Sequence, residues 1–110
     1  MPSKPRHPSL TFRLRLSKVL SELESAVREA SEGRWEEGDR QRSAEICWAL
    51  SRACQSEGLR EAAMAVRSMG CLMQLSREQI LPIEAAFREK LQELLAALQS
   101  SAYRVLTGSG

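Results

Sequence analysis

The sequence is poor in aromatic residues and in histidine. Only 5% of the 110 residues are aromatic, and His7 is the single histidine. β-Branched residues are also sparse, which argues against a β-sheet. A core must therefore be built mainly from leucine, alanine and methionine, which are residues that favour helices. The apolar fraction of 43% over one domain's length of chain is sufficient for a single core.

The shortage of histidine also limits the chemistry. With His7 in a Pro-rich stretch, no Ser–His or Cys–His pair can be assembled for nucleophilic catalysis. Phosphate-binding glycine loops are missing, because Gly33 and Gly38 stand in an acidic neighbourhood. The carboxylate pair Glu36 and Glu37 is typical of a solvated turn. We therefore expect a protein that is not an enzyme and that uses no cofactor.

Cysteine is scarce and its count is odd. Cys47, Cys54 and Cys71, with no secretory signal, predict free thiols in a reducing, cytoplasmic compartment. Cys47 and Cys54 would lie about 10 Å apart on one helix, too far for a disulfide. Without a second histidine there is no zinc-ligand set of ordinary spacing, so we expect no metal site. The three cysteines are expected to be buried as small apolar residues.

Acidic residues are missing from the first twenty positions. These positions carry five basic residues and no acid, whereas residues 21–37 carry six glutamates and two arginines. The net charge of +2 is too small for a dedicated nucleic-acid binder. The acid-free start resembles a transit peptide, but its three prolines interrupt a helix. No apolar run is long enough to span a bilayer, so neither nucleic acid nor membrane is expected as a partner.

A basic leader precedes the first predicted helix. Residues 1–8 are Pro-rich and polar, which predicts disorder. Ser9 is a suitable N-cap, and Gly33 a suitable end, for a helix with one apolar stripe. The alternation of apolar and polar residues over 10–16 also fits a strand. Because no second strand is available to pair with it, we interpret the segment as helical. The stripe comprises Phe12, Leu16, Val19, Leu23, Val27 and Ala30.

Two shorter helices are expected next. Asp39 can cap a helix that runs to about Glu57, and Gly58 is suited to end it. A third helix is expected over residues 59–72. Gly70 inside this pattern weakens the helix by about 1 kcal/mol relative to alanine, which indicates either fraying or a close packing contact. The inward face of the third helix is expected to be Ala62, Ala63, Val66, Met69 and Met73.

The last helix has the strongest pattern. Ser76 and Gln79 form a capping-box signature, and Pro82 implies either a kink or a start near Leu81. The apolar stripe from Ile83 to Val105 predicts a nearly straight helix that could also mediate a homodimer. The sequence thus predicts an all-α fold, an up-down antiparallel bundle of about four helices over residues 9–106, with a frayed end at 107–110.

The stretch from Ala49 to Ala63 resembles the central hairpin of histidine-phosphotransfer domains. Gly58 resembles their turn glycine. Counting back ten residues places Trp48 where that family carries its phospho-accepting histidine, Ser51 at its lysine position and Arg52 at its small glycine. The resemblance implies a degenerate, regulatory member that docks on receiver domains of two-component signalling without transferring phosphate.

The candidate interaction surface centres on Trp48. Helical spacing places Trp48, Ser51, Arg52 and Gln55 on one outward patch, and exposed Trp and Arg are favoured contact residues. Trp48 could instead lie at the edge of the core. Trp35 either holds its loop in place by packing or is a further residue that contacts the partner. The main hypothesis is a non-catalytic helical-bundle module that binds another protein.

Overall fold

The computed structural model describes residues 9–34 and 36–107. The element bounds are α1 Leu10–Ser31, α2 Glu37–Ser56, α3 Arg60–Met73, α4 Arg77–Ile80, a 3₁₀ turn Leu81–Ile83 and α5 Glu84–Leu106. No strand occurs among the described residues. The all-α prediction is therefore confirmed, while the expected leader at 1–8 and most of the expected frayed end lie outside the described residues.

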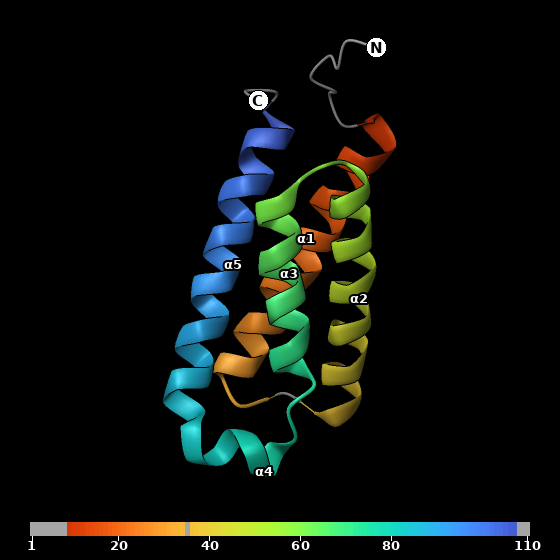
Figure 1. Cartoon of the computed structure of the whole chain (residues 1–110). Coiled ribbons are helices and arrows are strands. Elements are labelled where there is room, and N and C mark those ends of the chain that lie inside the picture. The colour runs from red at the N-terminus through yellow and green to blue at the C-terminus, as the bar shows by residue number, and fades with distance from the viewer. Residues whose placement is uncertain (1–8, 35, 108–110) are drawn as a thin grey trace.

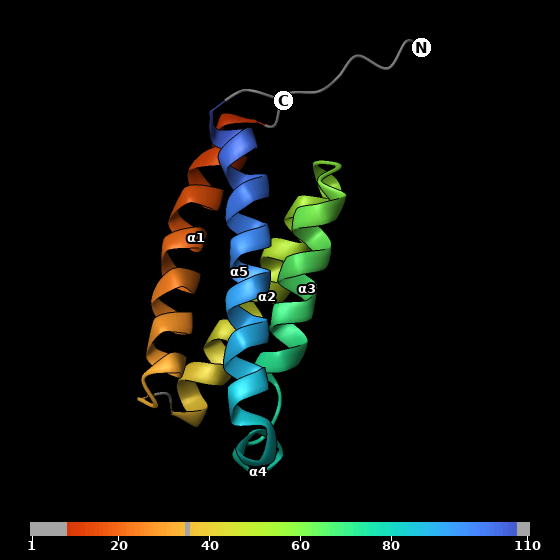
Figure 2. The ribbon, with the colours of Figure 1, turned by 90° about the vertical axis from the view of Figure 1, so that its left-hand side faces the viewer.

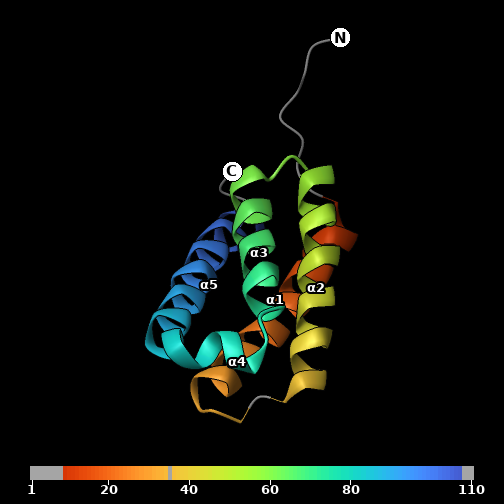
Figure 3. The same ribbon diagram turned by 60° about the horizontal axis from the view of Figure 1, so that its bottom comes forward.

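The four long helices alternate in direction and form an antiparallel bundle (Figure 1). α2 packs most closely against α3, α3 against α5, and α5 against α1, whereas α1 and α2 meet more loosely. α4 and the 3₁₀ turn lie across one end of the bundle (Figure 3). The predicted up-down bundle is thus confirmed, with one short additional helix.

Local chemistry explains most helix ends. The backbone N–H of Phe12 donates to Oγ of Ser9 at 3.1 Å, which confirms the predicted N-cap of α1. Gly33 and Gly58 follow α1 and α2 with φ of 73° and 76°, a conformation that glycine adopts readily. The turn after α2 is closed by the N–H of Leu59, which donates to the carbonyl of Cys54 at 2.9 Å.

The start of α2 differs from the prediction. The helix begins at Glu37, with Glu36 and not Asp39 at the N-cap. Asp39 is the third residue of the helix, and its carboxylate accepts from the N–H of Glu36 at 3.3 Å. Asp39 therefore stabilises the start of the helix from inside it, which is the second half of a capping box.

Pro82 implied either a kink or a helix start near Leu81, and the connection between α3 and α5 has elements of both. The predicted capping box is present: the N–H of Gln79 donates to Oγ of Ser76 at 3.2 Å, and Oε1 of Gln79 accepts from the N–H of Ser76 at 2.8 Å. Pro82, which has no N–H to donate, lies in the 3₁₀ turn, and α5 begins at Glu84. The chain makes a short turn of helix, bends, and then starts its last helix.

The core runs along the axis of the bundle and draws on all four long helices. The predicted inward face of α3 is confirmed, and Gly70 is buried with it. Along the α5 stripe, Ile83 is exposed, but the residues from Phe87 onward are buried or half-buried against α1 and α3. A homodimer through α5 stays a prediction. The largest fully buried side chains are Leu16, Leu23, Leu50, Met69, Met73, Leu91, Leu98, Val66, Cys47 and Cys54.

Two further findings, on membrane-spanning helices and on cysteines, concern the part of the chain that the structure describes. None of its helices combines the length and the apolar character needed to cross a membrane. The three cysteines are free, and Cys47 and Cys54 are buried as predicted. The expectation that Cys71 is buried is wrong: it follows Gly70 on the solvent side of α3 and is exposed.

Candidate functional site

Trp48 lies in the middle of α2, half-buried against α3. Its ring covers Gly70: a Cβ atom at position 70 would lie 3.3 Å from Cε2 and 3.4 Å from Cζ2 of Trp48, and 3.2 Å from Cβ of Cys47. Gly70 therefore permits a close approach of α2 and α3. Of the two explanations expected for this glycine, fraying or a close packing contact, the second applies. The position of Trp48 combines both earlier interpretations, because the indole packs on α3 at the edge of the core and remains partly accessible.

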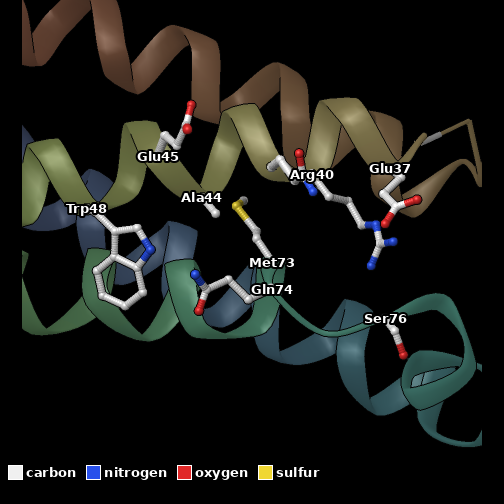
Figure 4. A pocket seen from close by; sticks show the side chains of 9 residues that line it. Glu37, Arg40, Ala44, Glu45, Trp48, Met73, Gln74 and Ser76 are labelled. Carbon is white, nitrogen blue, oxygen red and sulfur yellow. The ribbon is translucent and has the colours of Figure 1, made fainter.

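A groove opens beside Trp48, between α2 and the end of α3 (Figure 4). Its volume is about 470 Å³. Trp48 stands at one end of it, the buried residues Ala44 and Met73 lie at its base, and Gln74 reaches across from α3. The rim is polar or charged. The rim residues are Glu37, Arg40, Gln41, Glu45, Gln74 and Ser76.

Arg40 fixes the far end of this groove. Its guanidinium donates a hydrogen bond to the carbonyl of Leu75, just after α3 ends. This bond gives the carbonyl of Leu75, which lies in the connection between α3 and α4, a hydrogen-bond partner. It therefore ties α2 to that connection at this end of the groove.

The groove combines an apolar base with amide and charged groups at its rim. The described residues contain no histidine and no group of three or more metal-ligating side chains. The hydroxyl at the rim, Ser76, is engaged as the helix cap of α4. An indole at one end, a thioether at the base and amides at the rim can take up an apolar side chain and hydrogen-bond the backbone around it.

The remaining predicted site residues fall in different places. Arg52 and Gln55 are exposed on α2, about one and two turns beyond Trp48. The outward position expected for Ser51 is wrong. Ser51 is buried, and its hydroxyl donates to the carbonyl of Ala63 at 3.4 Å, because this side of α2 faces α3. Trp35 lies outside the described residues.

Several groove residues were not predicted from the sequence. Gln41 and Glu45 precede Trp48 by seven and three residues, which continues the exposed side of α2. That helical spacing was a usable signal. Arg40 and Gln74 carried no such signal, because their positions depend on how α2 meets the end of α3.

The two buried thiols are unreactive by their surroundings. Burial raises the pKa of Cys47 to about 12. Burial, together with the negative charge of Glu57, raises the pKa of Cys54 to about 11. Sγ of Cys47 also lies 3.7 Å from Sδ of Met73, within hydrogen-bonding range for sulfur. Both cysteines therefore remain protonated at neutral pH and act as apolar packing residues.

The hairpin of α2 and α3 bears on the resemblance to phosphotransfer domains. The two helices are the most closely packed pair in the bundle, and Gly58 forms the turn between them. The resemblance places Ser51 at a position where that family carries a lysine. Ser51 is buried, and this environment does not suit a lysine, whose ammonium needs water or a partner. Comparison of the chain with protein-family models, with curated proteins and with solved structures finds no match.

Proposed function

We propose that this protein is a non-catalytic helical-bundle module that binds another protein through the Trp48 face, which we define as Trp48, Arg52 and Gln55 of α2 with the adjoining groove. The observation that carries the proposal is the half-buried, still partly accessible indole of Trp48 at the end of a groove with an apolar base. A buried aromatic anchor beside a polar rim is the arrangement that concentrates binding energy in protein interfaces.

The charges next to Trp48 indicate the partner's chemistry. Among the described residues the salt bridges are Arg34–Glu32, Arg88–Glu84 and Arg104–Glu61, so Arg52 has no ion-pair partner there. Arg67 is likewise exposed and unpaired within that part of the chain, one turn before Gly70 on α3. Glu37 and Glu45 rim the groove itself, so a complementary partner segment places an apolar side chain in the groove and its acidic residues toward Arg52, on the other side of Trp48 from these glutamates.

The test is affinity capture from the native host with matched variants. Arg52→Glu and Trp48→Leu should each abolish capture of the partner, since one reverses a charge and the other removes the indole. Lys90→Glu, the same charge reversal at an exposed position of α5, should leave capture unchanged. Circular dichroism verifies that each variant folds. If folded Arg52→Glu and Trp48→Leu proteins capture the partner as well as the wild type does, the proposed face is wrong.

A second candidate is a regulatory pseudo-phosphotransfer domain that docks on receiver domains. The closely packed α2–α3 hairpin favours it, and Trp48 lies in mid-helix, where it is half-buried. It requires binding to isolated receiver domains from the same host with no transfer of phosphate. Titration calorimetry with those receiver domains tests it, and the absence of binding to every one would exclude it. The Arg52→Glu and Lys90→Glu pair serves as the control in the same assay.

A further inference from the structure

Among the described residues, four of the seven exposed large apolar side chains belong to the first turns of α1 and the last turns of α5. Leu10 and Leu14 are each 65% exposed at the start of α1, and Tyr103 is 67% exposed near the end of α5, where Leu106 is also exposed. The start of α1 and the end of α5 lie at the same end of the molecule, opposite α4 (Figures 1 and 2). We call these four residues the apolar end.

The two leucines face away from the core. Phe12 and Leu16 are buried on the inner side of α1, while Leu10 and Leu14, one turn apart, are exposed on its other side. The first turns of α1 are thus apolar on both sides, and only one side has a partner within the described residues. On a purely solvated face this spacing would carry polar residues.

The charged residues on the first turns of α1 are all basic. Residues 1–20 carry Lys4, Arg6, Arg13, Arg15 and Lys18 and no acid. Arg15 and Lys18 are exposed on α1 beside the leucines. Near this end, Glu57 and Glu61 belong to the α2–α3 hairpin, and Glu61 is paired with Arg104 of α5. Farther along α1 the acids begin at Glu22.

The sequence analysis expects no membrane as a partner because no segment can span one, but adsorption to a surface needs no spanning segment; we propose that the apolar end binds the surface of an anionic phospholipid membrane, lying on it without crossing it. Apolar side chains that enter the headgroup region next to lysine and arginine are the usual means of such adsorption. Tyr103 has the amphipathic ring that favours the interface between lipid and water. The glutamates farther along α1 are repelled by an anionic surface, so the bundle contacts it by this end alone.

Charge and composition favour the membrane over two other occupants. A second copy of the chain would bring two acid-free basic segments together, and their repulsion disfavours a dimer through this end. Nucleic acid would account for Arg15 and Lys18 but would leave Leu10 and Leu14 exposed to water. The Trp48 face lies on α2 and α3, so this proposal does not depend on the proposed function.

The test is co-sedimentation of the full chain with vesicles of phosphatidylcholine, with or without phosphatidylserine. The protein should bind the vesicles that contain phosphatidylserine, and binding should weaken as salt is added. The double variant Leu10→Ser, Leu14→Ser should lower the affinity at least about tenfold. Arg15→Gln and Lys18→Gln should each lower it about fivefold.

The matched control is Leu81→Ser, Ile83→Ser, which removes two exposed apolar side chains from the opposite end and should leave binding unchanged. Circular dichroism of all variants separates loss of binding from loss of fold. The proposal is overturned if wild-type protein ignores phosphatidylserine, or if the folded double variant of Leu10 and Leu14 binds as well as the control. It is equally overturned if sedimentation equilibrium shows that these leucines mediate a dimer that does not bind vesicles.

Discussion

Replacing Gly70 by alanine sets two effects of opposite sign against each other. In an unobstructed helix interior the change stabilises by about 1 kcal/mol, because alanine loses less backbone freedom on folding. Here the new methyl group would lie 3.2 Å from Cβ of Cys47 and 3.3 Å from Cε2 of Trp48. Both separations are shorter than ordinary van der Waals contact, so one helix or the indole must shift.

The second effect is expected to dominate. Forcing an extra methyl group into a packed interface typically costs about 1–3 kcal/mol. Subtracting the gain in helix propensity leaves a net destabilisation of about 1 kcal/mol. For a domain of this size that corresponds to a fall in Tm of about 4–8 °C.

A double-mutant cycle with Trp48→Ala identifies the cause. Two of the three closest contacts of the added methyl group are atoms of the Trp48 ring. In the Trp48→Ala background, Gly70→Ala should therefore cost less than in the wild type, although the contact with Cβ of Cys47 remains, and the coupling energy between the two sites should be about 1 kcal/mol. Urea unfolding followed by far-UV circular dichroism measures all four proteins.

Two results would refute the reasoning. If Gly70→Ala stabilises the wild-type protein by the full helix-propensity gain, the indole of Trp48 does not rest on Gly70. If the effect of Gly70→Ala is the same with and without Trp48, the destabilisation arises elsewhere.

Four further predictions test the helix cap, the core and, in two ways, the thiols. Ser9→Ala should destabilise by about 1 kcal/mol through loss of the bond to the N–H of Phe12, whereas Ser9→Asp should not; thermal unfolding compares them. Leu98→Ala should cost about 2–5 kcal/mol because Leu98 is fully buried, and an equal loss for Leu81→Ala, at an exposed position, would contradict this. A thiol reagent should modify Cys71 rapidly and the two buried cysteines only after unfolding. Burial raises the pKa of Cys47 to about 12 from an ordinary 9.0. Between these two pH values the folded state keeps the thiol proton that the unfolded state has lost. The free energy of unfolding should therefore fall as pH rises above 9.0, and less steeply in Cys47→Ala.

The sequence alone determined the type, the direction and most of the ends of the helices. The apolar spacing of residues 12–30 and 83–105 specified which face of each helix is buried, because a helix brings every third or fourth side chain to one side. Ser9, Gly33, Gly58 and the Ser76–Gln79 pair determined the ends, because each acts through bonds to its own neighbours. Local rules were not sufficient for Asp39, because an aspartate can stabilise the start of a helix either as the N-cap or from within the first turn.

Only the tertiary structure decided which residues form the candidate site. Whether Gly70 marked fraying or close packing, and whether Ser51 faced water or Ala63, depended on the rotation of α2 against α3. Helical spacing places Ser51 and Trp48 on neighbouring positions of one helix, and the neighbouring helix then buries one fully and the other partly. The groove follows from that packing, because its two sides come from α2 and from the segment after α3, which no local pattern relates.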